Sequence, residues 1–527
     1  MVYVSTYPDV EIPDGTVYDQ LFSTLTEGDL DRIAVVEDDR QLTYRALRDQ
    51  IDALAGALAA RGVRPGDVVA LCAPNGIGFV VAFHGILRAG ATATTLNVLY
   101  GPSEIASQLR DSGAKVCITV SLLLPAVLAG AGAAGMAAGN VIVLDDTAGH
   151  ESLADLLAEG RAAPEVAIDQ ETHLAVLPYS SGTTGKPKGV MLTHRNLVAN
   201  IAQCAAALPV GQDDVVLAVL PFFHIYGMNV IMNLTLRQRG RLVIMAKFDL
   251  PGFLSRVQMQ RCTSLYIAPP VAVALAKHPL VDSFDLSSVR LIVCGAAPMD
   301  EVLGSALTRR IPSLLMQGFG MTELSPVSHV TPCDVAGIPV GSIGTALPNV
   351  EFKVVDPETG REVAAVPGGR TTAGEMLVRS PGVMAGYLGN DQATRETIDA
   401  DGFLRTGDIV EVGPLGEVYV VDRLKELIKY KGYQVPPAEL EALLLTHPAI
   451  ADAAVVAFPD EDAGEIPRAF VVLQANAVAD RDEIMAYVAA RVAPHKRIRM
   501  VEFIESVPKS AAGKILRKDL RGLPVSV

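Results

Sequence analysis

The segment YSSGTTGKPKG, residues 179–189, says most about the fold of this chain. An apolar run at 174–177 precedes it, and an amphipathic stretch that opens at Thr193 follows it. The apolar positions of that stretch are Leu197, Ile201, Cys204 and Leu208. This order predicts a strand, a loop and a helix capped by the threonine. Glycines let the loop turn backbone N–H groups toward an anion, and hydroxyl and ammonium groups add donors, so we expect a phosphate-binding loop.

The loop is not of the Walker A type. Gly182 and Gly185 lie too close together, and Pro187 follows Lys186 where a Walker loop requires serine or threonine. The residues expected to contact the nucleotide phosphates are Ser180, Ser181, Gly182, Thr183, Thr184, Gly185 and Lys188.

Around this loop, strand-like and helix-like segments alternate through the first two thirds of the chain. The strand-like run 68–72 precedes a helical run at 78–88, and the run 290–294 precedes another. Such alternation predicts parallel sheets covered by helices. From about 341 to 421 the pattern changes to short alternating strands, for example 351–355, which predict a small antiparallel barrel or sheet.

The remaining residues predict a separate α+β domain. Its expected elements are a strand at 428–435, a helix opened by Pro436-Pro437, a strand at 453–457 and a helix near 482–491. The expected architecture is a large N-terminal α/β domain at 1–422, with two α/β subdomains and the barrel, followed by the small α+β domain at 423–527.

Length and composition exclude several classes of protein. A chain of 527 residues is too long for one compact core, and 50% hydrophobic against 20% charged residues argues against disorder. The net charge of −15 argues against binding to nucleic acid or anionic lipid. No basic and apolar leader is visible at the start, so no signal peptide is expected.

Two further features need an interpretation. The run between Lys115 and Asp145 contains no charged residue, but its proline, glycines and apolar clusters predict strand, short helix and strand in place of a membrane span. The six cysteines are scattered without a C-x-x-C pair, so we expect free, buried thiols in a reducing cytoplasm.

Together with three further motifs, the loop resembles the adenylate-forming superfamily of acyl-CoA synthetases, luciferases and peptide-synthetase adenylation domains. The motifs are QGFGMTE at 317–323, DRLKELIKYKGYQ at 422–434 and PKSAAGKILR at 508–517. The resemblance extends over essentially the whole chain. It implies that ATP activates a carboxylic acid to an acyl-AMP with release of pyrophosphate, and that a mobile C-terminal domain then helps to transfer the acyl group to CoA.

The resemblance implies roles for the residues of the first of these motifs. Phe319 offers a ring face to adenine, Thr322 a hydroxyl to the α-phosphate, and Glu323 a hard oxygen ligand to Mg²⁺. Asp408 and Arg423 are expected to hold the ribose hydroxyls. The other members of the motif, expected along the nucleotide, are Gln317, Gly318, Gly320 and Met321.

By the same resemblance, two lysines near the C-terminus serve different half-reactions. Lys514 would bridge the carboxylate and the α-phosphate during adenylation. After rotation about a hinge at Lys425, the residues Lys429, Gly432 and Gln434 would approach the site for thioester formation.

The acyl pocket resembles that of 4-coumarate–CoA ligases, and its expected lining is Tyr226, Gly227, Val230, Gly295, Ala296, Gly318, Gly320, Pro326 and Val327. His224, in LPFFHIYG at 220–227, is expected to gate this pocket from the thiol tunnel and not to act as a general base. Val293 stands where plant coumarate ligases tend to carry a lysine, and Val230 replaces a small polar residue. We therefore expect a hydrophobic acid, of the cinnamate type or a medium-chain fatty acid, with the aryl acid ranked first.

Other functions stay open at this point. The chain could be a medium-chain fatty acyl-CoA synthetase, or an acyl-AMP ligase that serves a carrier protein, although the lack of a trailing carrier domain favours free CoA. A luciferase has no specific support. A non-catalytic nucleotide-binding scaffold would be expected to have lost the charged motif residues, which are present here. We expect a cytoplasmic monomer or homodimer.

Overall fold

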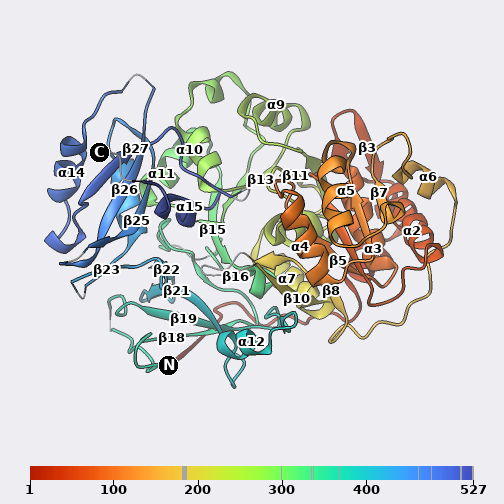
Figure 1. Ribbon diagram of the computed structural model, residues 1–527, viewed down its shortest axis with the longest axis horizontal. Coiled ribbons are helices and arrows are strands. Elements are labelled where there is room, and N and C mark those ends of the chain that lie inside the picture. Colours follow the sequence, from red (N-terminus) through yellow and green to blue (C-terminus); the bar gives the residue numbers. More distant parts are fainter. Residues whose placement is uncertain are drawn as a thin grey trace.

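The computed structural model describes residues 1–180, 187–297, 299–333, 335, 337–366, 368–431, 433–460, 462–475, 477–510 and 513–524. The N-terminal α/β layers lie at one end of the molecule and the C-terminal elements at the other, and a small antiparallel sheet lies beside both (Figure 1). The residues described therefore form the predicted combination of a large α/β part and a smaller α+β part.

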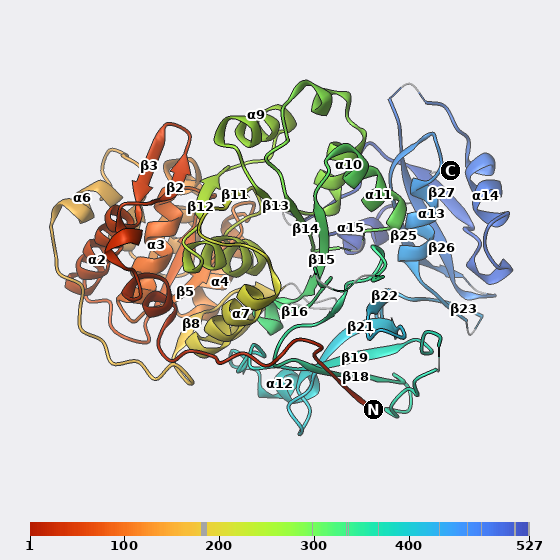
Figure 2. The same cartoon turned by 180° about the vertical axis from the view of Figure 1, so that it is seen from behind.

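The first sheet is mainly parallel and contains the neighbouring strands β8, β5, β4, β6 and β7. These strands are β4 (Val68–Cys72), β5 (Thr92–Thr95), β6 (Val116–Thr119), β7 (Val141–Val143) and β8 (Leu174–Val176). Helices α3 (Ile77–Arg88) and α5 (Leu124–Ala133) pack against this sheet, and α2 (Tyr44–Ala60) and α4 (Pro102–Ser112) pack on α3 and α5 in turn (Figure 2). Strands followed by helices account for the parallel pairing that the alternation predicted.

The edge of this sheet carries the end of the phosphate loop. Strand β10 (Lys188–Thr193) pairs antiparallel with β8, with β9 (Tyr179–Ser180) and with β20 (Gly386–Tyr387). Helix α7 (His194–Ala207) follows directly, and the Thr193 hydroxyl accepts a hydrogen bond from the Asn196 amide at 3.2 Å. The predicted cap is confirmed, and the predicted apolar stripe of this helix is buried.

The second sheet runs in the order β17-β16-β15-β14-β13-β11-β12-β2-β3, and its centre from β12 to β15 is parallel. Its strands are β2 (Ile33–Glu37), β3 (Arg40–Thr43), β11 (Val215–Ala218), β12 (Arg241–Ile244), β13 (Ser264–Ile267), β14 (Leu291–Cys294), β15 (Leu314–Gly320), β16 (Val327–Val330) and β17 (Thr345–Ala346). Helices α9 (Leu250–Gln260), α10 (Pro269–Lys277) and α11 (Glu301–Arg310) connect its central strands. The carboxyl ends of β14 and β15 lead into predicted site residues, and ligands of open α/β sheets bind at such ends.

The third sheet is antiparallel, as its alternating sequence predicted. Its order is β1 (Val2–Val4), β18 (Glu351–Val355), β19 (Gly374–Arg379), β21 (Leu404–Val412) and β22 (Val418–Arg423). The edge strand β1 comes from the N-terminus, which the sequence pattern did not predict (Figure 2). Tyr3 lies opposite Phe352, and the two rings stack with centroids 4.8 Å apart.

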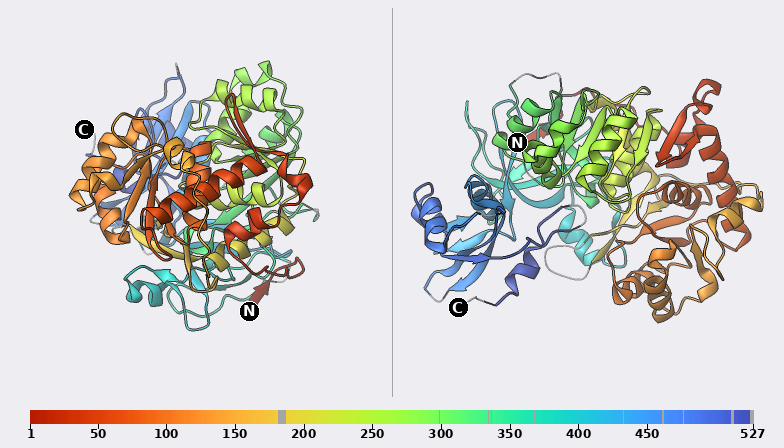
Figure 3. Two further views of the ribbon diagram at one scale, coloured as in Figure 1. Left: turned by 90° about the vertical axis from the view of Figure 1, so that its right-hand side faces the viewer. Right: turned by 90° about the horizontal axis from the view of Figure 1, so that it is seen from above.

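The C-terminal part has its own sheet and its own hydrophobic cluster, which begins at Ile428 (Figure 3). Its elements are β23 (Ile428–Tyr430), β24 (Tyr433–Val435), β25 (Ile450–Asp460), β26 (Gly464–Leu473), β27 (Met500–Phe503), α13 (Pro437–Leu445), α14 (Arg481–Ala489) and α15 (Arg517–Arg521). The predicted single strand at 428–435 is wrong, because β23 and β24 form a hairpin. Lys431 has a φ of +46°, and a left-handed residue at this point reverses the chain.

The expectations about the charge-free run at 116–144 and about the cysteines have different outcomes. No helix within the described ranges is long and apolar enough to cross a membrane, and the charge-free run forms β6, α5 and β7 with short turns between them. Five cysteines are free and buried as expected, but Cys333 is exposed. It lies in the segment that leaves β16, and connecting segments run over the surface.

Candidate active site

The base of the phosphate loop is held by a short antiparallel ladder. Ser180 lies opposite Lys188, and Tyr179 lies opposite Gly189. The Tyr179 hydroxyl donates to Asp111 Oδ2 at 2.6 Å, which ties the start of the loop to α4. The predicted ligands at 181–186 lie outside the described residues. The ladder brings the two ends of the loop, Ser180 and Lys188, together.

Lys188 and Glu323 are brought together by a residue that the sequence analysis missed. The Lys188 ammonium lies over the Tyr387 ring, 4.7 Å from its centroid. The hydroxyl of the same tyrosine donates to Glu323 Oε1 at 3.0 Å. Tyr387 and Glu323 are buried, at 7% and 6% exposure. The predicted metal ligand and the predicted phosphate ligand therefore share one aromatic neighbour.

The motif at 317–323 spans the end of β15 and a short 3-10 turn, Thr322–Leu324. Gln317 is held by the main chain, since its Nε2 donates to the Met299 carbonyl at 3.0 Å and its Oε1 accepts from the Met299 amide at 3.0 Å. Phe319 makes an edge contact with the His329 ring, with centroids 6.3 Å apart. A Cβ on Gly320 would lie 2.4 Å from the Pro326 carbonyl oxygen, so only glycine fits there.

Asp408 and Arg423 are direct neighbours across β21 and β22, and the guanidinium Nε lies 3.2 Å from Asp408 Oδ1. Asp408 is buried, and its other oxygen, Oδ2, has no hydrogen-bond partner among the described residues. Burial raises the pKa of this carboxyl, and the positive charges of Arg423 and Lys514 oppose the shift. A buried oxygen without a partner is unusual, and it marks a place where a ligand donor would fit.

Lys514 reaches the same place from the C-terminal domain. Burial lowers the pKa of its ammonium to about 8, with Arg423 acting in the same direction and Asp408 against it. Burial also lowers the pKa of the His224 imidazole to about 4, and Lys514 contributes to that shift. These four side chains therefore interact electrostatically across the two domains. With a pKa this low, the His224 imidazole is neutral near pH 7 and only a weak base.

The loop that carries Lys514 lies against the N-terminal domain. Gly513 has a φ of +83°, and a Cβ there would lie 3.4 Å from Ala268 Cβ and 3.5 Å from the Pro270 ring. The loop also has a hydrogen bond of its own, which the Lys514 amide donates to the Ser510 hydroxyl at 3.1 Å. The start of α10 thus supports the loop in this conformation.

The predicted acyl pocket gathers around the π-helix η4 (Tyr226–Asn233). The Tyr226 ring lies against Gly295, where a Cβ would be 3.2 Å from its Cε1, and its hydroxyl donates to the Val293 carbonyl at 3.3 Å. A Cβ on Gly227 would lie 2.1 Å from the Pro221 carbonyl oxygen. Val230 is buried, and Ala296 has a strained φ of +73°. π-Helices are rare and are frequently found at functional sites.

Buried amides hold this pocket in place, and the sequence analysis missed them too. Asn229 Nδ2 donates to the Ser325 carbonyl at 2.7 Å, which fixes the turn before Pro326 and Val327. Asn75 Nδ2 donates to the Leu220 carbonyl at 3.0 Å, at the start of the segment that carries His224. Isolated asparagines give no signal in the sequence that distinguishes such a role from a turn.

Of the residues predicted for thioester formation, Lys429 does not lie with this group. Lys429 is exposed on β23, and its amide donates to Glu465 Oε2 at 2.7 Å within the C-terminal domain. Lys425 borders a cavity of about 520 Å³ that Arg468 and Arg521 also line. Gly432 lies outside the described residues, as does the side chain of Gln434.

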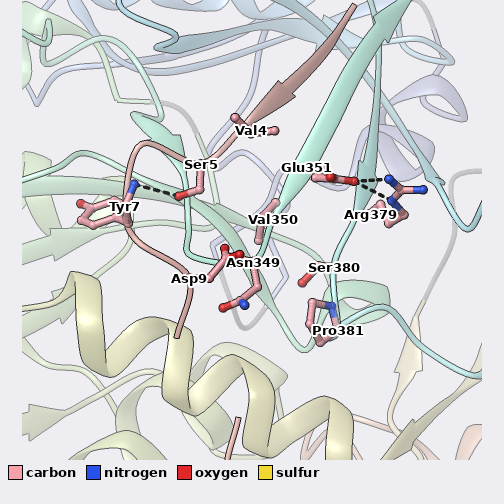
Figure 4. A pocket seen from close by; sticks show the side chains of 10 residues that line it. All are labelled: Val4, Ser5, Tyr7, Asp9, Asn349, Val350, Glu351, Arg379, Ser380 and Pro381. Carbon is pink, nitrogen blue, oxygen red and sulfur yellow. Dashed lines mark hydrogen bonds and ion pairs between the residues drawn. The ribbon is translucent and has the colours of Figure 1, made fainter. Parts of the chain in front are cut away.

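A second cavity, of about 540 Å³, lies between the N-terminal segment and the antiparallel sheet (Figure 4). It is lined by Val4, Ser5, Tyr7, Asp9, Asn349, Val350, Glu351, Arg379, Ser380 and Pro381. The Glu351–Arg379 ion pair crosses its wall (Figure 4). None of the predicted site residues lines it, so it is separate from the site described above.

Residues 23–388 match the AMP-binding enzyme family and residues 439–514 match the AMP-binding enzyme C-terminal domain. The 4-coumarate–CoA ligase 5 of Oryza sativa subsp. japonica is 42% identical over 99% of this chain and 97% of its own length. This chain belongs to the family of AMP-forming acid–CoA ligases. The 4-coumarate–CoA ligase of Pinus taeda is 40% identical over 99% and 97% of the two chains.

Solved structures of AMP-binding enzymes share the whole architecture. The anthranilate CoA ligase AuaEII in complex with anthranoyl-AMP gives a TM-score of 0.87 at 28% identity, over 96% of both chains. ATP-bound MatB from Rhodopseudomonas palustris gives 0.86 at 28% identity, over 96% of this chain and 98% of that one. Apo MatB gives only 0.75 over the same shares. The chain thus resembles the ATP-bound form more than the apo form of one AMP-binding enzyme.

Proposed function

We propose that this AMP-binding enzyme activates a hydrophobic aryl acid of the 4-coumarate or cinnamate type with ATP and transfers the acyl group to CoA. The observation that carries the proposal is the convergence of Lys514, Asp408, Arg423 and His224 from two domains next to the adenylate motif. In the first half-reaction a carboxylate oxygen bonds to the α-phosphorus, the bond to the β-phosphate breaks, and pyrophosphate leaves. Such a displacement needs positioning and neutralisation of charge more than covalent help.

Lys514 supplies the positive charge in this proposal. A protonated ammonium between the acid carboxylate and the α-phosphate offsets the repulsion between two anions and holds them in line. Its lowered pKa of about 8 still leaves it mostly protonated near pH 7. His224, neutral at that pH, closes the acyl side of the site without taking a proton.

The residues present fit a nucleotide with Mg²⁺. The unpartnered oxygen of Asp408 suits a ribose hydroxyl as donor. Glu323 offers one buried carboxylate, and Mg²⁺ is usually held by one or two carboxylates together with substrate phosphates and water. No group of three or more acidic, histidine or cysteine side chains among the described residues could hold a metal, so the nucleotide would supply most ligands. When bound, the ion would neutralise phosphate charge.

The second half-reaction needs a different arrangement of the two domains. The CoA thiolate bonds to the acyl carbon, the bond from that carbon to the AMP oxygen breaks, and AMP leaves. The exposed position of Lys429 on β23 supports a rotation about Lys425 that would bring this face to the site in place of Lys514.

The predicted acyl pocket is apolar, and this supports an aryl acid whose ring meets no charged side chain at its far end. The Tyr226 hydroxyl is already bonded to the Val293 carbonyl, and Val230 and Val293 add apolar surface. Relatives of about 40% identity are 4-coumarate–CoA ligases, which supports the aryl class. A medium-chain fatty acid is the second candidate, because an apolar pocket discriminates weakly between apolar acids of similar volume.

Acid-dependent release of pyrophosphate over a panel of acids tests the proposal. We expect cinnamate and 4-coumarate to give the highest kcat/KM, and hexanoate or octanoate to be about tenfold or more below them, because the loss of even one methylene-sized contact in an apolar pocket costs about 1–3 kcal/mol. Higher values with the fatty acids would favour the second candidate. Turnover with acetate or an amino acid alone would contradict both.

A further inference from the structure

Tyr387 lies between two groups of opposite charge. On its ring face lies the Lys188 ammonium, 4.7 Å from the centroid, and its hydroxyl donates to Glu323 Oε1 at 3.0 Å. The cation, the ring and the carboxylate thus follow one another in that order. Both Tyr387 and Glu323 are more than nine-tenths buried. No ion pair of Lys188 is found in the described part of the chain.

The main chain fixes the ring in this position from both sides. The Met384 amide donates to the Glu323 carbonyl at 2.9 Å, and the Leu388 amide donates to the Gly189 carbonyl at 2.9 Å. Between these two bonds, β20 pairs with β10, and Tyr387 lies opposite Val190. The segment therefore bridges the strand that leaves the phosphate loop and the turn that carries the predicted metal ligand.

An ammonium and a carboxylate in a buried site attract each other strongly, because the local dielectric is low. If the ring were absent, Lys188 could swing toward Glu323 and form a direct ion pair. Such a pair would occupy the carboxylate that a metal needs and the ammonium that a phosphate needs. The aromatic ring prevents this while it stabilises both groups, the cation through its face and the carboxylate through its hydroxyl.

We propose that Tyr387 is a positioning residue that keeps Lys188 and Glu323 apart, so that both stay available to the triphosphate and its divalent cation. The proposal rests on the proposed function, in which Lys188 contacts a phosphate and Glu323 the metal. It assigns two separable contributions to one side chain. The ring spaces the charges, and the hydroxyl orients the carboxylate.

Binding of Mn²⁺ in the presence of ATP and without acid tests this, with free Mn²⁺ followed by electron paramagnetic resonance. Tyr387→Phe keeps the ring, so we expect Mn²⁺ affinity to fall by no more than about threefold. Tyr387→Leu removes both contributions, and we expect a fall of about tenfold or more. Tyr44→Phe removes another buried hydroxyl, one that donates to the Gly240 carbonyl at 2.7 Å, and serves as the matched control. It should leave Mn²⁺ affinity unchanged.

A double-mutant cycle separates spacing from general damage to the fold. If Lys188 collapses onto Glu323 in Tyr387→Leu, then Lys188→Met in the same chain removes the competing cation. The effect of Tyr387→Leu on Mn²⁺ affinity should then fall to threefold or less in the Lys188→Met background. A tenfold effect in both backgrounds overturns the spacing role. The proposed metal site is tested apart from this: if Glu323→Gln leaves Mn²⁺ affinity unchanged, the metal assignment itself fails.

Discussion

At the scale of single residues, the site is governed by what burial does to ionisable groups. Lys514 and His224 both have a lowered pKa because burial disfavours their charged forms. The two pKa values lie on opposite sides of pH 7, so the lysine keeps its charge and the histidine does not. That difference agrees with the proposal, in which the lysine neutralises charge and the histidine closes the acyl side of the site.

We predict an alkaline limit for adenylation that belongs to Lys514. Its pKa falls from 10.5 to about 8, so the ammonium loses its proton as the pH rises through about 8. The kcat/KM for ATP in pyrophosphate exchange, which reports the free enzyme, should fall about tenfold for each pH unit above that value. Lys514→Arg keeps its charge at high pH and should lose this limb, even if its rate near pH 7 is lower. If kcat/KM of the arginine variant fell in the same way above about pH 8, the loss of activity would belong to a group other than Lys514.

A second prediction at this scale concerns the acid. Val293→Lys introduces an ammonium where plant coumarate ligases tend to carry one. We expect the ratio of kcat/KM for 4-coumarate over cinnamate to rise about tenfold, with some loss of stability because Val293 is only 3% exposed. Val293→Met, of similar length and without charge, is the control and should leave the ratio within about twofold. If the ratio changed in neither variant, the phenol hydroxyl of the acid would bind away from residue 293.

At the scale of elements, close contacts of the main chain shape the acyl pocket. The π-helix η4 approaches the segment before His224 so closely that Gly227 has no room for a side chain. Backbone hydrogen bonds also hold this region. The His224 amide donates to the Pro221 carbonyl, and the Met228 amide donates to the His224 carbonyl. The close packing at Gly227 is therefore one of the contacts that set the position of Tyr226.

We expect Gly227→Ala to displace η4, because its Cβ would overlap the Pro221 carbonyl oxygen. The free energy of unfolding should fall by about 1–3 kcal/mol, and the KM for the acid should rise more than that for ATP. Gly211→Ala is the control, since nothing lies within 4 Å of a Cβ there. Thermal denaturation and initial-rate kinetics measure the two effects. Equal changes in both KM values would mean that the substitution acts on the whole fold.

At the scale of the whole molecule, the two domains meet with Lys514 at the N-terminal site and Lys429 away from it. The TM-score with ATP-bound MatB is higher than that with apo MatB, so this arrangement of the chain is more similar to the ATP-bound structure. If both lysines serve one site, as proposed, the C-terminal domain has to change its orientation between the two half-reactions.

The two lysines should therefore separate the two half-reactions. We expect Lys514→Ala to abolish pyrophosphate exchange and yet to convert supplied acyl-AMP to the thioester with CoA, and Lys429→Ala to do the reverse. Exchange assays and thioester formation from synthetic acyl-AMP measure each half on its own. If each variant lost both half-reactions equally, the assignment to two conformations would be wrong.

Local sequence was enough for the parts of this protein that depend on neighbouring residues. The Thr193 cap, the stripe on α7 and the strand β18 follow from side chains a few positions apart. Motif resemblance predicted that Asp408 and Arg423 act together, and the structure pairs them. Phosphate binding by the loop stays a prediction, because residues 181–186 lie outside the described residues.

Only the tertiary structure decided the contacts between distant segments. The Tyr387 hydroxyl donates to the carboxylate of Glu323, 64 positions away in the sequence. Strand β1, at the N-terminus, pairs with β18, which is remote in the sequence. Such contacts depend on which faces pack together and leave no periodic signal in the sequence. The phosphate loop that identifies the family was readable from 11 residues in a row. The surroundings of this loop could not be read from the sequence. Burial and the pairing of side chains set the pKa values and the distances between charges, and both are properties of the folded chain.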